Sequence, residues 1–256
     1  MTPVERIEAA RKSLREAEHE IAAALKDNNS RARAPFVRLL HEVRGMLSPA
    51  FPYTSQAGQD QIVDRIFKGK RDGTFVDVGA YDGVSGSNSL FFEKWRGWSG
   101  VMVEPVALQR ERPEMQRSTP FLPAAVAAEN GHASFMAVTE GYTQMSGLVD
   151  QYDASMLDRV RADPRHEEQM ITVETRTLSA ILTEADIINP DFISLDIEGG
   201  ELAALEAFPF EAHRVQAWAI ENNNGRPDIA NLMRAKGYNL IEFCGPDEIY
   251  ALPQVV

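Results

Sequence analysis

The 256-residue sequence predicts an α/β fold with a mostly parallel sheet, a terminal antiparallel hairpin and an N-terminal helical extension. From residue 74 onward, short apolar runs alternate with helical segments, which is typical of parallel strands joined by crossover helices. The last two apolar runs, Tyr238–Phe243 and Glu248–Leu252, are separated by Gly245-Pro246-Asp247, a break that predicts a hairpin turn. We therefore expect a helical extension over residues 1–50 and one α/β domain over residues 51–256.

The parallel sheet is predicted from five short apolar runs. These runs are Thr74–Val78, Gly100–Val103, Phe121–Ala127, Asp191–Leu195 and Val215–Ile220. The helices expected between or after them cover Ser87–Trp95, Gly200–Ala207 and Pro227–Lys236.

An insertion over residues 128–189 separates the third and fourth predicted strands. It contains two further predicted strands, His132–Val138 and Ile171–Thr175, and a polar helix over Asp153–Glu168. Ligands of doubly wound sheets bind beyond the carboxyl ends of the strands. We therefore expect the insertion to form a lid or a substrate wall.

The N-terminal extension begins with a predicted helix over Pro3–Lys26. Ile7, Leu14 and Ile21 recur every seventh residue, and alanines interleave with them at the spacing of a short coiled-coil seam. A second amphipathic run places five apolar side chains on one side, opposite Arg38, His41 and Arg44; the five are Phe36, Leu39, Leu40, Val43 and Met46. We expect packing on the domain or a homodimer, and a basic helix on an anionic membrane is the alternative.

Composition excludes several classes of protein. The formal net charge of −12 argues against binding nucleic acid through phosphates. A single cysteine, Cys244, excludes an internal disulfide and a cysteine-based zinc site. No apolar run approaches the ~20 residues of a membrane span, and the first residues lack a secretory signal, so we expect a cytoplasmic protein.

The strongest local motif is TFVDVGAYDG, which covers residues 74–83. An apolar strand leads to Asp77, and Gly79 and Gly83 then allow a sharp turn against a ligand. The glycines are spaced G-x-x-x-G rather than the G-x-G-x-x-G of dinucleotide sites. The carboxylates of Asp77 and Asp82 would repel a pyrophosphate and suit a cationic ligand such as S-adenosylmethionine.

A second acidic residue, Glu104, ends the strand in GVMVEP. A carboxylate at this strand tip can accept hydrogen bonds from both ribose hydroxyls. NAD enzymes use an acidic residue similarly, so Glu104 predicts a nucleoside without naming the cofactor.

The motifs SQAGQD, FVDVGAYDGVSGSNS, FFEKWRGWSGVMVEP and ISLDIEGGELAALEAF, in this order, resemble the FkbM family of methyltransferases. The resemblance covers about residues 52 to 251. It implies a class I, Rossmann-like fold, S-adenosylmethionine as donor, and O-methylation of a sugar, glycan or polyketide-type acceptor. The cofactor-side residues that it implies are Ser55, Gln59, Asp77, Gly79, Ala80, Tyr81, Asp82, Gly83, Asn88, Glu104, Pro105 and Ala125. No acidic side chain stands beside Ala125 to bind the adenine amine, so backbone groups or Glu129 would have to serve.

A group of acidic residues follows the fourth and fifth predicted strands. Adjacent tips of parallel strands lie about 5 Å apart, so Asp196 and Glu221 should converge beside the methyl donor. Two chemistries stay open. Asp196 or Glu198 acts as general base on the acceptor hydroxyl, with Glu201 nearby, or a divalent cation such as Mg²⁺ is held by Asp196, Glu221 and Asn222.

Two other functions compete with methyl transfer. A nucleotide-dependent oxidoreductase would need a third glycine in the loop and a proton-transfer set, and the sequence shows neither. A non-catalytic nucleoside-binding module has no physical reason to crowd carboxylates at two strand tips. The best-supported function is therefore an S-adenosylmethionine-dependent O-methyltransferase.

Overall fold

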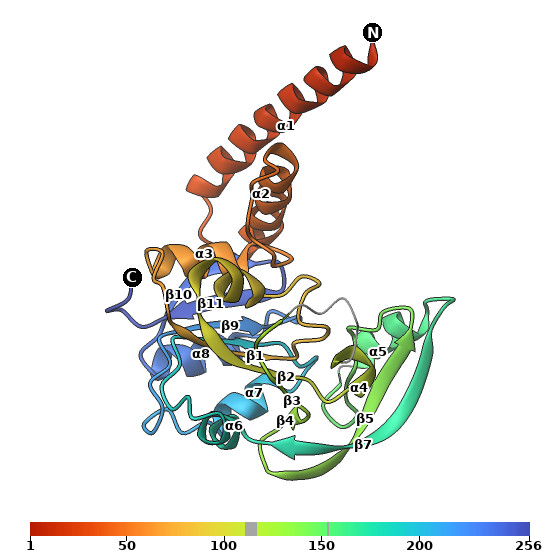
Figure 1. Cartoon of the computed structure of the whole chain (residues 1–256), viewed down its shortest axis with the longest axis vertical. Helices are drawn as coiled ribbons and strands as arrows, with labels where there is room; N and C mark the ends of the chain where they lie inside the picture. Colours follow the sequence, from red (N-terminus) through yellow and green to blue (C-terminus); the bar gives the residue numbers. More distant parts are fainter. Residues whose placement is uncertain (111–116, 153) are drawn as a thin grey trace.

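The computed structural model describes residues 1–110, 117–152 and 154–256. Two long helices, α1 (Pro3–Lys26) and α2 (Ala34–Leu47), project from the α/β body and are linked by the short turn η1 (Arg31–Arg33) (Figure 1). The body contains a seven-stranded sheet and a smaller four-stranded sheet. Among the described helices, none is both long and apolar enough to cross a membrane.

The large sheet is mostly parallel, as predicted. Its strands are β1 (Thr74–Val78), β2 (Ser99–Val103), β3 (Phe121–Leu122), β8 (Phe192–Leu195), β9 (Ala217–Glu221), β10 (Asn239–Cys244) and β11 (Asp247–Ala251). Their spatial order is β10-β11-β9-β8-β1-β2-β3, and β11 pairs antiparallel with both neighbours. The order reverses at β1, so the ligand crevice is expected there.

Helices cover both faces of this sheet. On one face, α6 (Leu178–Glu184), α7 (Glu201–Glu206) and α8 (Pro227–Ala235) bury apolar side chains against Val76 and Val78. On the other face, α3 (Gln59–Ile66) and the π-helical segment η2 (Phe92–Arg96) pack against Phe75. The alternation along β1 follows from the two-residue period of a strand that is buried on both sides.

The smaller sheet lies to one side of the body and has the order β4-β7-β5-β6 (Figure 1). Its strands are β4 (Ala125–Val126), β5 (Gly131–Glu140), β6 (Gly147–Leu148) and β7 (Glu167–Arg176), with α5 (Ala154–Arg161) beside them. Most of the predicted insertion forms this sheet, whereas α6 packs into the core of the large sheet.

Three predicted elements differ from the structure. The strand expected over Phe121–Ala127 divides into β3 and β4, which belong to different sheets, because Pro123 lacks the amide needed to continue a ladder. The helix expected from Ser87 begins at Leu90, whose amide is capped by Ser87 Oγ. The polar helix expected over Asp153–Glu168 ends at Arg161, and residue 153 lies outside the described residues.

The buried face of α2 also differs from the prediction. Phe36, Leu39 and Met46 are exposed, whereas Val37 and His41 are buried. His41 was expected on the polar side, yet its ring packs edge-on against Phe51 with centroids 5.1 Å apart. Burial lowers the pKa of His41, which favours the neutral ring.

Candidate active site

A cavity of about 420 Å³ opens at the carboxyl edge of the large sheet. The pairing register brings the ends of β1, β2, β8 and β9 to the same level. The residues at or just beyond these ends are Gly79, Glu104, Asp196 and Glu221, and all four line the cavity. Strand register thus places Glu104, expected on the nucleoside side, and the acidic residues Asp196 and Glu221 in one row.

Most of the expected cofactor-side residues line this cavity. They are Gln59, Asp77, Gly79, Ala80, Tyr81, Asn88, Glu104, Pro105 and Ala125. The remaining three residues, Ser55, Asp82 and Gly83, are not part of the cavity lining and contact residues next to it. Ser55 Oγ donates to Asp60 Oδ1 at 2.5 Å, and Asp82 Oδ1 accepts from the amide of Ser85 at 2.7 Å. A side chain at Gly83 would press on the sulfur of Met102.

The turn after β1 requires glycine at its first position. Gly79 has a φ of 75°, which L-residues with a Cβ rarely adopt. A Cβ at Gly79 would lie 1.6 Å from the carbonyl oxygen of Asp196. Close backbone contact therefore joins the turn to the loop that carries the acidic residues.

Glu104 is held in place by backbone amides. Its Oε2 accepts from the amide of Tyr81 at 3.1 Å, and its Oε1 accepts from the amide of Val106 at 2.9 Å. Burial raises the pKa of Glu104 to about 7, although these two hydrogen bonds oppose the rise. Each carboxylate oxygen keeps capacity for a further donor.

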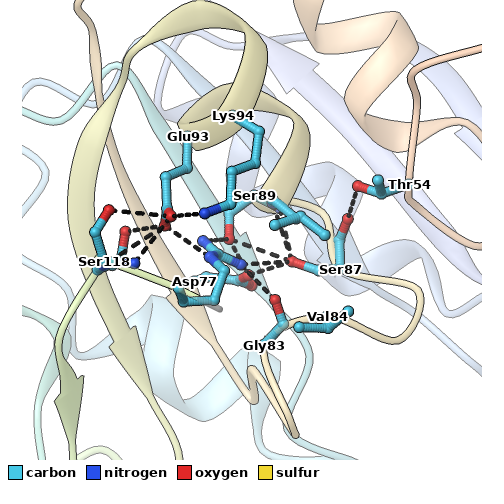
Figure 2. Close-up of polar contacts among 12 residues, drawn as sticks. Thr54, Asp77, Gly83, Val84, Ser87, Ser89, Glu93, Lys94 and Ser118 are labelled. Carbon is cyan, nitrogen blue, oxygen red and sulfur yellow. Dashed lines mark hydrogen bonds and ion pairs between the residues drawn. The ribbon is translucent and has the colours of Figure 1, made fainter. Parts of the chain in front are cut away.

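Asp77 lies in a polar network under the turn (Figure 2). Its Oδ2 accepts from Ser89 Oγ at 2.5 Å and, more weakly, from Ser87 Oγ at 3.4 Å. Burial raises the pKa of Asp77, and the Ser89 hydrogen bond and the charge of Arg117 counteract that rise.

Arg117 completes this network, although no pattern in the sequence singles it out. Its guanidinium donates to Glu93 Oε2 at 2.7 Å, to Ser89 Oγ at 3.0 Å and to the carbonyl of Gly83. The side chain is 1% exposed, so the buried cation is neutralised by Glu93. A local motif cannot reveal this role of Arg117, because the residues that it contacts lie far from it in the sequence.

Gln109 is a second residue that sequence reasoning missed. It lies on the short helix α4 (Ala107–Arg110), is 2% exposed and lines the cavity beside Ala124, Ala125 and Val126. Its Oε1 has no hydrogen-bond partner among the described residues. Glu129 was the side chain expected to bind the adenine amine. Its backbone carbonyl accepts a hydrogen bond from Thr175 Oγ1.

Three acidic side chains converge at the other end of the cavity. Asp196, Glu198 and Glu221 each offer a carboxylate oxygen, and these oxygens lie within 4.8 Å of one another. Burial and the neighbouring negative charges of Asp247 and Glu201 raise the pKa of Asp196 to about 8. Burial and the charge of Asp196 likewise raise the pKa values of Glu198 and Glu221.

The side chains of Glu201 and Asn222 make hydrogen bonds within the surrounding loops. Glu201 Oε1 accepts from the amides of Ile197 and Gly199 at 2.9 and 3.2 Å, so it braces the loop at the start of α7. Asn222 Nδ2 donates to the carbonyl of Arg226 at 2.9 Å and to Glu248 Oε1 at 3.0 Å. Glu198 is thus the third carboxylate of the cluster, and the Asn222 amide is hydrogen-bonded to Arg226 and Glu248.

The insertion and the N-terminal extension both reach the site. Tyr81 Oη and Thr143 Oγ1 are 2.7 Å apart, which joins the turn after β1 to the loop before β6. Arg31 donates to Glu248 Oε1 at 2.5 Å and to the carbonyls of Pro246 and Asn222, and so holds the loop after β9. His166, which lies in the insertion, places its Nε2 2.8 Å from Glu168 Oε2.

Comparisons with known proteins cover the region that carries this site. The family model for the methyltransferase FkbM domain matches residues 77–240, which is more than half of the chain. Among solved structures, methyltransferase FkbM from Methylobacillus flagellatus KT is 15% identical with a TM-score of 0.44, and the match covers 92% of this chain and 58% of that one. The chain thus spans less than two thirds of that structure's length. No curated protein matches the chain.

Proposed function

Because the chain belongs to the FkbM methyltransferase family, we propose that it transfers a methyl group from S-adenosylmethionine to a hydroxyl oxygen of a sugar, glycan or polyketide-type acceptor. The observation that carries the proposal is that one cavity is lined by Glu104 at one end and by the acidic residue Asp196 at the other. The Gly79 turn lies between the two ends.

The residues at the Glu104 end fit an adenosyl group. Apolar side chains of Ala125, Val126 and Phe135 line this end and suit a flat base. The unpaired Oε1 of Gln109 is an acceptor, and adenine presents a 6-amino donor that a glutamine amide can bind. Glu104 offers carboxylate oxygens to the ribose hydroxyls.

The amino-acid end of the donor would lie beyond the turn. Asn88 Nδ2 donates to Ser194 Oγ at 2.9 Å, while its Oδ1 has no partner in the described parts of the chain. This acceptor and the carboxylate of Asp77 line the same cavity and suit an ammonium group.

The acidic end supports removal of the acceptor proton. When bound, S-adenosylmethionine would supply an electrophilic methyl group on a sulfonium sulfur. Asp196 or Glu198 would accept the hydroxyl proton as the hydroxyl oxygen takes the methyl group, and the sulfonium would leave as a neutral thioether that keeps the electron pair of the broken carbon–sulfur bond. A raised pKa suits this role, because a general base works best when its pKa is near the working pH.

The same carboxylates also suit a divalent cation. Glu198 Oε2 and Glu221 Oε2 are buried and lack partners among the described residues, and a purely oxygen donor set fits Mg²⁺, Ca²⁺ or Mn²⁺. We propose Asp196, Glu198 and Glu221 as the ligands of such a cation. It would lower the pKa of the acceptor hydroxyl in place of a free base.

Calorimetric titration tests the donor assignment. We expect S-adenosylmethionine and S-adenosylhomocysteine to bind in the micromolar range, and NAD to show no heat of binding. Glu104→Ala should abolish the binding. Binding of NAD without binding of either adenosyl ligand would overturn the proposal.

A further inference from the structure

A second cavity of about 300 Å³ lies next to the donor cavity. The residues that line both cavities are Met156, Glu198, Glu221 and Asn223. The two spaces therefore meet at the carboxylate cluster. A molecule in the second cavity would approach that cluster from the side opposite the nucleoside end.

Three buried hydrogen-bond acceptors in the lining of the second cavity lack donors among the described residues. Gln151 Oε1, Glu198 Oε2 and Glu221 Oε2 are buried and have no partner within the described ranges. A buried acceptor without a donor is costly. The cavity is thus suited to a ligand that presents several hydroxyl donors.

The charge of the lining excludes an anionic ligand. The acidic side chains in the wall are Glu198, Glu201, Glu221 and Asp228, and they outnumber the single arginine of the wall, Arg226. A phosphate or carboxylate group inside the cavity would be repelled by the ionised acidic side chains of the wall. An anionic ligand is therefore disfavoured, and the buried acceptors that lack donors in the described part of the chain favour a ligand that carries hydroxyl groups.

Other polar groups shape the mouth of the cavity. Asn223 is exposed at the border of the two cavities, and its amide offers both a donor and an acceptor. Tyr152 Oη donates to the carbonyl of Met145 at 2.8 Å, which fixes the segment that carries Gln151. The apolar part of the lining consists of Met156, Leu202, Ile229 and the backbone around Gly199.

We propose that the second cavity is the acceptor site, that it takes a neutral polyhydroxylated ring such as a pyranose, and that Gln151 and Asn223 bind the hydroxyls that are not methylated. This inference rests on the proposed methyl transfer. The reacting hydroxyl lies at the border of the cavities, beside Glu198. The size of the cavity admits a small ring, and its many acceptors disfavour an apolar polyketide surface.

Saturation-transfer NMR on the protein saturated with S-adenosylhomocysteine tests this site directly. The probes are the methyl pyranosides of glucose, galactose, mannose and rhamnose, with glucuronate as the anionic comparison and cyclohexanol as the apolar one. We expect a signal from at least one neutral pyranoside and none from glucuronate or cyclohexanol.

Two variants assign the contacts. Gln151→Leu removes the unpaired acceptor, and Asn223→Ala removes an exposed amide that should tolerate replacement. Each should raise the KM or dissociation constant for the pyranoside about tenfold, with unchanged affinity for S-adenosylhomocysteine. Asn231→Ala, on the exposed side of α8, is the matched control and should change neither value.

The outcomes separate this inference from the proposed function. Binding of S-adenosylhomocysteine with no pyranoside signal, with a preference for glucuronate or cyclohexanol, or with unchanged pyranoside affinity in both variants would overturn the acceptor site alone. Failure of S-adenosylhomocysteine to bind would overturn the proposed methyl transfer itself.

Discussion

The carbonyl oxygen of Asp196 occupies the space that a Cβ atom would need at Gly79, at a separation of 1.6 Å. Because Gly79 begins the turn after β1 and Asp196 begins the acidic loop, this contact sets the distance between the proposed donor site and the proposed base. Any side chain at residue 79 must push the two segments apart.

Gly79→Ala should therefore lower both stability and activity. We expect a loss of about 2–4 kcal/mol in the free energy of unfolding, from the backbone clash and the φ of 75° together. Gly237→Ala is the control, because Gly237 has a φ of 87° but no described atom within 4 Å of the position that its Cβ would take. The control substitution should lower the free energy of unfolding by only about 1–2 kcal/mol. Equal losses in urea unfolding would show that the contact with Asp196 is unimportant.

Donor binding should weaken as the pH falls below about 7. The pKa of Glu104 is raised to about 7, and only the ionised carboxylate can accept from both ribose hydroxyls without losing an oxygen to its own proton. Because burial raises the pKa of Glu104 in the folded protein, the folded state binds more protons than the unfolded state between pH 4.5 and 7. The free energy of unfolding therefore falls as the pH rises through this range. Calorimetry on both sides of pH 7 measures the effect on binding, and Glu104→Gln should remove the pH dependence. A wild-type affinity that is flat across this range would contradict the assignment.

Gln109 should distinguish adenine from its deaminated form. S-inosylhomocysteine carries a 6-oxo group in place of the 6-amino donor, so it would face the unpaired Oε1 of Gln109 with another acceptor. We expect the wild-type protein to prefer S-adenosylhomocysteine at least tenfold. Gln109→Leu should erase the preference, whereas Gln109→Glu keeps an acceptor and should keep it. If the leucine variant still discriminates, another group binds the 6-amino position.

Asp196→Asn should separate binding from turnover. The amide keeps the volume of the carboxyl group but cannot accept the acceptor proton, so turnover should fall about 10²-fold or more while affinity for S-adenosylhomocysteine changes little. Full activity in this variant would remove Asp196 from the chemistry.

A chelator separates the two roles proposed for the carboxylates. Loss of activity on addition of EDTA, with recovery on addition of Mg²⁺, indicates that Asp196, Glu198 and Glu221 hold a cation. Activity that persists in EDTA indicates a direct carboxylate base.

The exposed seam of α1 predicts a homodimer. Ile7 is 55% exposed, whereas the later seam residues Leu14 and Ile21 are half-buried near α2. Ile7→Glu should shift the protein from dimer to monomer in light scattering, because it places a charge in the seam. Lys12→Glu introduces the same residue away from the seam and should leave the mass unchanged. A wild-type monomer at high concentration would end this proposal.

Local sequence was enough for most strands of the large sheet and for the row of residues at the strand ends. The apolar runs predicted β1, β2, β8 and β9 to within a few residues, since period and length are local properties. The convergence of Asp196 and Glu221 followed from the rule that neighbouring parallel strands end at one edge. The interruption at Pro123 and the late start of the helix after Ser87 were not predicted, because they depend on hydrogen bonds made with the neighbouring strands and with Asp77.

The sequence by itself determined the parallel sheet, the G-x-x-x-G turn and the acidic strand tips, because each depends on residues close together in the chain. Only the tertiary structure decided that Glu198 joins Asp196 and Glu221 in one carboxylate cluster, that Arg117 shares the hydrogen-bonding partner Ser89 with Asp77, and that Gln109 lines the cavity. These choices depend on contacts between segments far apart in sequence. Tertiary packing decides which hydrogen-bond partner such a side chain meets, and a local sequence pattern carries no information about that packing.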